Sequence, residues 1–139
     1  MADFQKGEEA YEAGDYAAAL REFIPLAEQG DAESQRCLGR IYVLGEGVAQ
    51  DYAKAAKWSR KAAEQGDAEA QMFLGLMYAN GDGVDQDFEQ AAHWWRKAAE
   101  QGHAHAQFNL GARYRLGEGV AQDYSQAVEW YCKAAEQGD

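Results

Sequence analysis

The stretch Ala27-Glu28-Gln29-Gly30 returns at residues 63–66, 99–102 and 135–138, so the chain repeats itself every 36 residues. A period of this length is typical of solenoid proteins, in which each unit is one supersecondary motif that buries its apolar face against its neighbours. Proteins of this kind usually bind other molecules and seldom catalyse reactions. The period therefore favours a binding function.

Composition supports a small folded array and excludes some partners. The 139 residues leave room for about four repeats, and 47% of them are hydrophobic, enough to form a core. A net charge of -11 repels a phosphate backbone, which argues against nucleic acid as a partner. No apolar run approaches the roughly 18 residues that cross a bilayer, and the start of the chain lacks the pattern of a signal peptide. We expect a cytoplasmic protein without membrane insertion, or a periplasmic or secreted one if a signal peptide has been removed.

Within one period the pattern predicts two helices joined by a glycine turn. Asp31 is the expected N-cap of a helix that Gly45 and Gly47 end, and Asp51 caps a second helix that stops at Gly66. The predicted units cover residues 1–30, 31–66, 67–102 and 103–138 of a single repeat domain. The first unit is shorter, and its Pro25 should kink the second helix.

The repeat residues are similar to those of a known family. The pattern Ala-x-x-x-Leu-Gly-x-x-Tyr-x-x-Gly-x-Gly-Val-x-x-Asp-x-x-x-Ala-x-x-Trp-x-x-x-Ala-Ala-x-x-Gly covers residues 70–102 and again 106–138, and it resembles the Sel-one-like repeat (SLR), a relative of the tetratricopeptide repeat. The resemblance implies an all-α, right-handed α/α superhelix that acts as an adaptor between proteins. It does not name a partner.

An enzyme is the alternative from another class, because some cysteine-rich members of this family have been linked to penicillin binding and β-lactam hydrolysis. That serine chemistry needs Ser-x-x-Lys, and here Ser34, Ser59 and Ser125 are followed three residues later by other residue types. The cysteine pattern of those relatives is also missing. Cys37 and Cys132 lie almost three periods apart, so we expect two free thiols, both buried.

Histidines give the only hint of a metal site. His103 and His105 are two residues apart, a spacing that sends side chains to roughly opposite faces of a helix, so we expect no metal site and no cofactor. His103 instead replaces the capping aspartates of the other units.

Positions that recur should hold the fold, and positions that vary between copies are free to select a partner. The recurring Trp58, Trp94 and Trp130 are therefore predicted core residues, as are Tyr42, Tyr78 and Tyr114. By analogy with tetratricopeptide geometry, the first helix of each unit lines a concave groove. The partner-binding candidates at its variable positions are Arg36, Arg40, Met72, Leu76, Asn80, His105, Phe108 and Arg115.

These candidates suggest a peptide partner with apolar anchors and an acidic group. Met72, Leu76 and Phe108 offer apolar contact, and the arginines offer planar donors to carboxylates. The alternative is that the arginines are solvated, or paired with Glu33 and Glu69. Trp95, whose counterparts are Ser59 and Tyr131, is expected to fill a gap in the packing.

The sequence therefore predicts a scaffold with a protein or peptide partner and no catalytic site. A dimerisation module is the third reading, because the last hairpin carries apolar residues that no following unit covers: Ala106, Leu110, Tyr114, Ala127, Trp130, Tyr131 and Ala134. We expect part of that surface to be open, either because the chain is a piece of a longer array or because it self-associates.

Overall fold

The chain folds into helices only. The computed structural model describes residues 1–137, so the predicted end of the last repeat at Gly138 and Asp139 lies outside it. Within residues 1–137 there are eight α-helices and no strand. The helices form hairpins in chain order, and the first helices of these hairpins are α1 (Phe4–Glu12), α3 (Ala32–Leu44), α5 (Ala68–Asn80) and α7 (Ala104–Leu116). The second helices are α2 (Tyr16–Glu28), α4 (Tyr52–Glu64), α6 (Phe88–Glu100) and α8 (Tyr124–Ala135).

Helix boundaries follow from capping residues that recur with the repeat. The carboxylates of Asp31 and Asp51 accept hydrogen bonds from the backbone N–H groups of Ser34 and Lys54, as predicted. His103 performs the same task in α7, because its Nδ1 accepts from the N–H of Ala106 at 3.2 Å. Each of these bonds satisfies an N–H that the first turn of a helix leaves without a partner.

The paired glycines after α3, α5 and α7 form structural turns. Gly45 and Gly47 have φ angles of 71° and 75°, and their counterparts 36 and 72 residues later adopt the same left-handed backbone. Side chains other than glycine rarely occupy this region. The Gly-x-Gly motif is therefore a turn.

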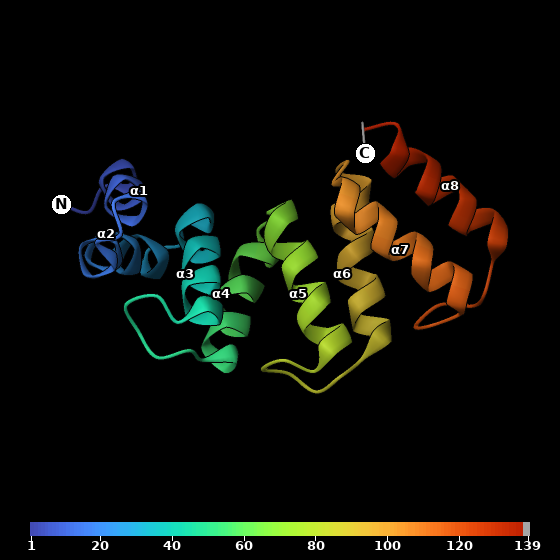
Figure 1. Ribbon diagram of the computed structural model, residues 1–139, viewed down its shortest axis with the longest axis horizontal. Coiled ribbons are helices and arrows are strands. Elements are labelled where there is room, and N and C mark those ends of the chain that lie inside the picture. The colour runs from blue at the N-terminus through green and yellow to red at the C-terminus, as the bar shows by residue number, and fades with distance from the viewer. Residues whose placement is uncertain (138–139) are drawn as a thin grey trace. The chain divides into compact units, whose positions relative to one another are not determined.

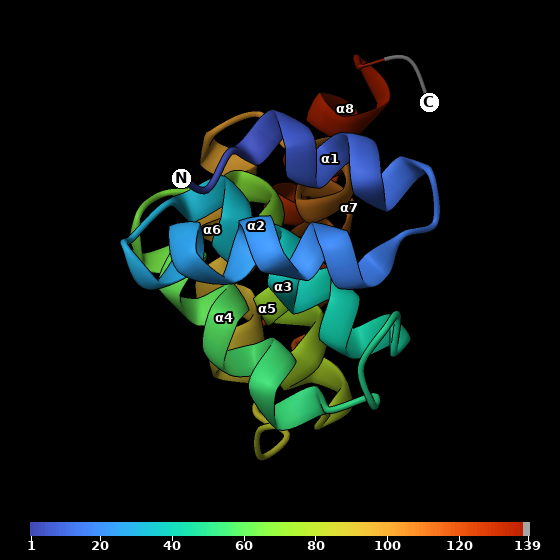
Figure 2. The same ribbon diagram turned by 90° about the vertical axis from the view of Figure 1, so that its left-hand side faces the viewer.

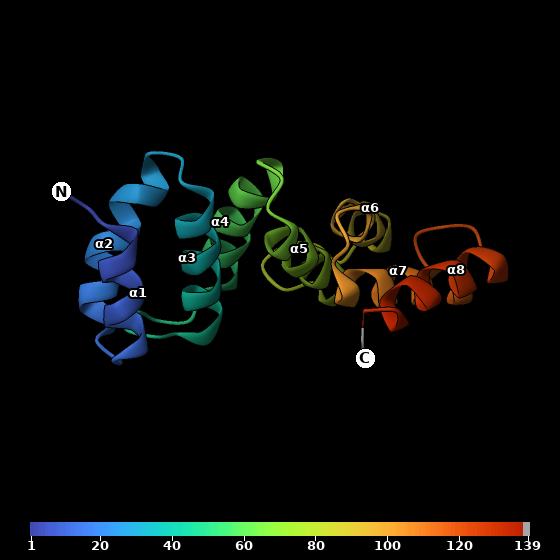
Figure 3. The ribbon, with the colours of Figure 1, turned by 90° about the horizontal axis from the view of Figure 1, so that it is seen from above.

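By their contacts, the helices group into two compact units of two hairpins each. Unit 1 runs from Met1 to Asp67 and contains α1 to α4, and unit 2 begins at Ala68 and contains α5 to α8. In unit 1, α2 packs on both α1 and α3, and α1 and α2 run side by side in Figures 1 and 2. In unit 2, α6 packs on α5 and α7, and α7 lies beside α8 (Figure 3).

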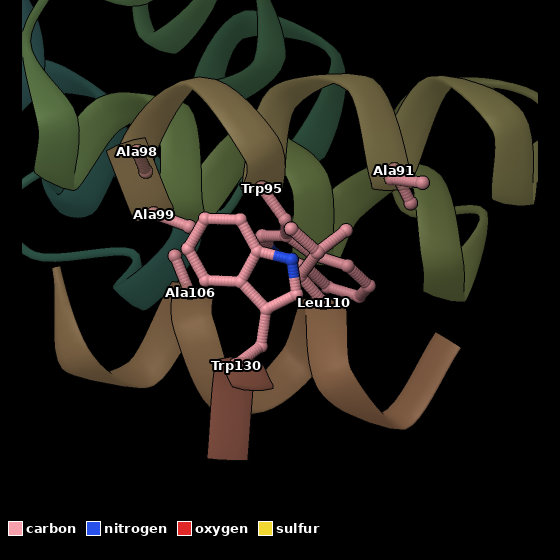
Figure 4. Close-up of a cluster of buried hydrophobic side chains, with 8 residues drawn as sticks. Ala91, Trp95, Ala98, Ala99, Ala106, Leu110 and Trp130 are labelled. Atoms are coloured by element: carbon pink, nitrogen blue, oxygen red, sulfur yellow. The ribbon is translucent and has the colours of Figure 1, made fainter. Parts of the chain in front are cut away.

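Each unit has its own apolar core. The core of unit 1 joins α2 to α3 through Phe23, Leu38 and Ile41, which are at most 1% exposed. The core of unit 2 joins α6, α7 and α8. Figure 4 shows Trp95 and Trp130 converging near Leu110, with Ala98, Ala99 and Ala106 beside them. Among residues 1–137, no helix is long and apolar enough to cross a membrane.

The structure confirms the packing role of Trp95 and corrects several burial predictions. Trp94, Trp95 and Trp130 are buried, whereas Trp58 is only half-buried, as are the recurring tyrosines Tyr42, Tyr78 and Tyr114. These half-buried rings keep part of their surface in solvent while their other side packs. Helix α2 continues through Pro25 to Glu28.

The prediction that both thiols are buried is wrong for one of them. Cys37 is buried, but Cys132 is exposed. Cys132 occupies the repeat position of Arg60 and Arg96, which are half-buried and polar. The repeat register therefore places this thiol on a solvent-accessible side of its helix, although cysteine is usually a buried residue type.

A chain of glutamine hydrogen bonds links successive helices, and it was not predicted from the sequence. The Nε2 of Gln35 donates to the carbonyl of Ala27, and Gln107 donates to Ala99 in the same way. Gln65 and Gln137 in turn donate to the side-chain oxygens of Gln35 and Gln107. These bonds satisfy polar groups in the buried contact between one hairpin and the next.

Candidate protein-binding surface

Arg36 is held by an ion pair and offers less to a partner than its residue type suggests. Its Nε lies 3.1 Å from the Oδ2 of Asp67, and the two side chains are 29% and 14% exposed. Glu33 and Glu69 were the carboxylates expected to pair with the arginines, and Asp67 is a partner that was not predicted. The partner lies 31 residues along the chain, at the start of the following repeat.

Arg40, by contrast, remains exposed on α3 beside the first hairpin. Its guanidinium carbon lies 5.4 Å from the centre of the Tyr11 ring, within cation–π range. The hydroxyl of Tyr11 donates to a carboxylate oxygen of Glu46 at 2.6 Å. Burial and this bonded carboxylate raise the pKa of Tyr11 to about 12, so the phenol is neutral at physiological pH.

A hollow of about 150 Å³ opens between α1 and α3 of unit 1. It is lined by Glu8, Tyr11, Glu12, Phe23, Cys37 and Arg40. Burial raises the pKa of the Cys37 thiol, although Arg36 and Arg40 oppose the shift. The thiol is therefore protonated and a poor nucleophile, and the hollow is an apolar recess with a charged rim.

Helix α1 contributes Glu8, Tyr11 and Glu12 to this hollow, and none of these residues was predicted to bind a partner. An added Cβ on Gly7 would meet Phe23, just as one on Gly39 would meet Ser59, and these two partners are 36 residues apart. Aligning Gly7 with Gly39 puts Glu8 in register with Arg40. The shorter turn of the first repeat hides this correspondence in the sequence. Aligning the two glycines would have revealed it.

In unit 2, two of the predicted contact residues serve internal packing. Met72 and Leu76 are half-buried against the core of the unit. The sulfur of Met72 lies 3.6 Å from the Nδ2 of Asn109 on α7, and its backbone oxygen accepts a hydrogen bond from Trp95. Asn80 is the exposed last residue of α5.

The structure brings His105 and Phe108 together on α7, where they face α8. Phe108 is 57% exposed, and its ring centre lies 5.2 Å from that of Tyr131. A hollow of about 310 Å³ is lined by Ala104, His105, Phe108 and Ala134. Arg115 is exposed and donates from Nε to the hydroxyl of Tyr131 at 3.2 Å.

The spacing of His103 and His105 predicted side chains on opposite faces of the helix, and this prediction is wrong. Their ring centres are 6.1 Å apart, because His103 is the extended N-cap residue and does not follow the helical rotation. Burial lowers the pKa of His103, and Glu69 opposes this shift. Among residues 1–137, no group of three or more histidine, cysteine, aspartate or glutamate residues is placed to hold a metal ion.

Two of the three serines that could act as nucleophiles are occupied with folding, and the third, Ser125, is exposed on α8. Ser34 is fully buried, and its hydroxyl donates to the capping carboxylate of Asp31. Ser59 is 1% exposed and lies against Gly39. Neither hydroxyl faces one of the two hollows.

Known proteins resemble this chain over most of its length. The Sel1 repeat family matches residues 32–67, 68–103 and 104–139. Among curated proteins, none matches the chain significantly. A Sel1 repeat protein from Oxalobacter formigenes has a crystal structure that matches with a TM-score of 0.94 and 39% identity, over 99% of this chain and 56% of that one.

Two further solved structures match the chain. The protective antigen c5321 of uropathogenic Escherichia coli, described as having an SLR fold, matches with a TM-score of 0.85 and 38% identity over 100% of this chain and 34% of that one. Cysteine-rich protein B of Helicobacter pylori matches with a TM-score of 0.68 and 25% identity, over 87% of this chain and 86% of that one. The chain thus spans about half of the first relative and a third of the second.

Proposed function

Because the chain belongs to the Sel1 repeat family, we propose that it is an adaptor that binds a partner protein or peptide through exposed side chains of its first helices. Repeats of this family generally serve as scaffolds for protein–protein interaction. The partner-binding residues are those that vary from repeat to repeat and remain accessible: Arg40 in unit 1, and Asn80, His105, Phe108 and Arg115 in unit 2.

One observation carries this proposal: recurrence and burial go together along the first helices. Leu38, Leu74 and Leu110 recur and are fully buried. At the neighbouring variable positions, Arg40 and Phe108 are exposed, and each borders a hollow. Side chains that recur thus stabilise the array, while exposed ones that differ are available for recognition.

The two hollows suggest what a partner contributes. A carboxylate of the partner can accept two parallel hydrogen bonds from the guanidinium of Arg40. An apolar group of the partner then enters the recess beside Tyr11 and Phe23. Glu8 and Glu12 on the rim repel a partner that is acidic throughout. The preferred segment therefore has one acid next to apolar side chains.

A hydrolase is the weaker proposal. The cysteine-rich relative from Helicobacter pylori shares the fold, but here Cys37 and Cys132 are free and buried serines cap or pack helices. Neither hollow contains a histidine or lysine close to a serine. The arrangement supports binding better than acyl transfer.

The experiment is affinity capture from an extract of the native cell with three forms of the chain, followed by mass spectrometry. The wild type and Arg21→Ala, which removes an exposed arginine from α2, should retain the same partner, whereas Arg40→Ala should lose it. A partner captured equally by all three forms would show that Arg40 takes no part in binding.

A further inference from the structure

The hollow of unit 1 has two walls of opposite charge. On one wall, α1 contributes Glu8 and Glu12, which lie one helical turn apart and are both exposed. On the other wall, α3 contributes Arg40, which is exposed as well. Phe23 and Cys37 also line the hollow, and because they are only 1% and 6% exposed they form its floor. A group that enters therefore meets carboxylates on one side, a guanidinium on the other and an apolar surface below.

Glu8 and Glu12 stand where acidic side chains destabilise a helix. Like charges four residues apart repel each other, and Glu12 is the last residue of α1, where the negative end of the helix dipole disfavours an acid. Within residues 1–137, neither carboxylate makes an ion pair or a hydrogen bond. By contrast, the carboxylates of Asp67 and Glu118 pair with arginines of their own units. A cation held between Glu8 and Glu12 relieves both unfavourable effects.

The floor of the hollow suits the apolar part of a single side chain. The buried thiol of Cys37 lines it and has no hydrogen-bond partner among residues 1–137. Burial raises the pKa of this thiol, and Glu8 raises it further while Arg40 lowers it, so the charges of both walls act at the floor. The volume of about 150 Å³ is that of a protein cavity that holds one benzene-sized group. The hollow therefore has room for one side chain and not for a helix.

The corresponding place in unit 2 is occupied by larger side chains of the chain itself. Asn109 stands two periods after Cys37, and its Nδ2 lies 3.6 Å from the sulfur of Met72 on α5. Trp95 stands at the register of the smaller Phe23. The hollow with charged walls is therefore particular to unit 1, and it does not follow from the packing of the repeats as such.

We propose that this hollow binds a lysine side chain of the partner, with its ammonium between Glu8 and Glu12 and its methylene stem on Phe23 and Cys37. The inference rests on the proposed function, since it names the apolar group that enters beside Arg40. Lysine fits the site because its compact ammonium has three donors, enough for two carboxylates, on a flexible stem. The stem leaves water while the charge stays at the exposed rim.

The charged walls also select the residue next to this lysine. Successive side chains of an extended segment point to opposite sides. A segment that runs between α1 and α3 with its lysine toward Glu8 therefore turns the neighbouring side chain toward Arg40. An aspartate or glutamate at that neighbouring position forms the second ion pair. The partner motif is thus a lysine directly beside an acidic residue.

The test uses three capped tetrapeptides, titrated into the isotopically labelled full chain and followed by nuclear magnetic resonance. The parent peptide is acetyl-Gly-Lys-Glu-Gly-amide. In the second peptide norleucine replaces the lysine, which keeps most of the stem and removes the charge, and in the third glutamine replaces the glutamate. We expect the parent to shift resonances of the residues that line the hollow. The norleucine peptide should bind about fivefold more weakly, as expected for the loss of partly exposed ion pairs.

Variants of the chain locate the ammonium. The double change Glu8→Gln and Glu12→Gln should remove the preference for lysine over norleucine, because glutamine keeps the shape and the helix propensity without the charge. The matched control, Glu9→Gln with Glu28→Gln, removes the same net charge from exposed positions that do not line the hollow, and it should keep the preference. Arg40→Ala should keep the preference for lysine and lose the preference for glutamate.

The outcomes separate this inference from the proposed function. The inference is overturned if the parent peptide causes no shifts up to its solubility limit, if lysine and norleucine peptides bind the wild type equally, or if the preference for lysine survives the loss of both carboxylates. Binding of n-butylammonium as tight as that of the parent peptide would assign the hollow to free amines and overturn it as well. A preference for glutamate that survives Arg40→Ala contradicts the role of Arg40 in the proposed function, whereas the preference for lysine is judged by Glu8 and Glu12 alone.

Discussion

The indole Nε1 of Trp95 donates a hydrogen bond to the backbone oxygen of Met72, 3.0 Å away on the neighbouring helix. The ring reaches this carbonyl because it lies directly against Gly75, where any added Cβ would overlap the indole. The same close approach recurs between Gly39 and Ser59 and between Gly111 and Tyr131. One glycine per first helix therefore sets how closely the two helices of a hairpin pack.

This relationship predicts a reversal of sign in a double-mutant cycle. Gly75→Ala should destabilise the wild type, because the methyl group displaces Trp95. In a Trp95→Ala background the same change should stabilise by about 0.5–1 kcal/mol, since alanine favours a helix over glycine. Trp95→Ala alone should cost about 3–5 kcal/mol. Urea denaturation of the four proteins measures the cycle, and equal effects of Gly75→Ala in both backgrounds would contradict it.

Gly119 tests the close approach between successive repeats. It has a φ of 77°, and a Cβ there would run into the backbone of Phe88. Gly102 has a φ of 93° but open space around it. Gly102→Ala should therefore cost only the left-handed strain, about 1–2 kcal/mol, and Gly119→Ala should cost clearly more. Equal losses in thermal or urea unfolding would show that the turn tolerates displacement.

The cap at His103 gives α7 a dependence on pH. Burial holds the folded-state pKa of this imidazole below its ordinary value of 6.5, and its neutral Nδ1 accepts the bond from Ala106. Below pH 6.5 the unfolded chain binds the extra proton more readily than the folded one. The stability that neutral His103 contributes is thus complete above pH 6.5, and it is lost as the pH falls through the folded-state pKa of this imidazole.

His103→Asp should remove this dependence and raise stability by about 0.5–1 kcal/mol, because aspartate is a stronger N-cap. The check is the difference in unfolding free energy between variant and wild type, measured from pH 7 to pH 5. We expect the difference to grow in favour of the variant as the pH falls. A constant difference over this range would show that His103 does not titrate in concert with folding.

Tyr11 gives the opposite sign at alkaline pH. Its folded-state pKa of about 12 lies above the ordinary 10, so the folded chain keeps this proton longer than the unfolded one. The stabilisation is complete below pH 10 and is lost as the pH rises through 12. The ultraviolet titration curve of Tyr11→Phe should therefore contain one late-titrating phenol fewer than that of the wild type. An unchanged late phase would assign it to another tyrosine.

Repetition made the fold predictable, because every structural device occurs at a fixed register. The capping aspartates, the glycine turns and the replacement of a cap by His103 were all legible from spacing. Cys132 shows the limit of judging burial by residue type, since its register matches that of Arg60 and Arg96. Recurrence at one register also fails as a guide to burial in places, since Trp58 is only half-buried while Trp94 and Trp130 are buried.

The binding surface was less predictable, because variation between repeats does not say which neighbour a side chain meets. Met72 and Phe108 share one register, but α7 half-buries the first while no described helix covers the second. Arg36 and Arg40 lie one helical turn apart, yet only Arg36 reaches Asp67. Packing between hairpins decides which variable residues remain accessible. The positions of residues within a repeat do not give that packing.

The proposed adaptor function requires that exposed, variable first-helix residues bind a partner while recurring residues hold the fold. Its most direct test is the affinity, by calorimetry, of the captured partner for the wild type, Arg40→Ala and the control Arg21→Ala, with unfolding curves for all three. We predict that Arg40→Ala lowers the affinity for the partner by at least about tenfold. Its unfolding free energy should stay within about 1 kcal/mol of the wild type, and Arg21→Ala should bind with wild-type affinity. Equal affinities for the three proteins would contradict the claim.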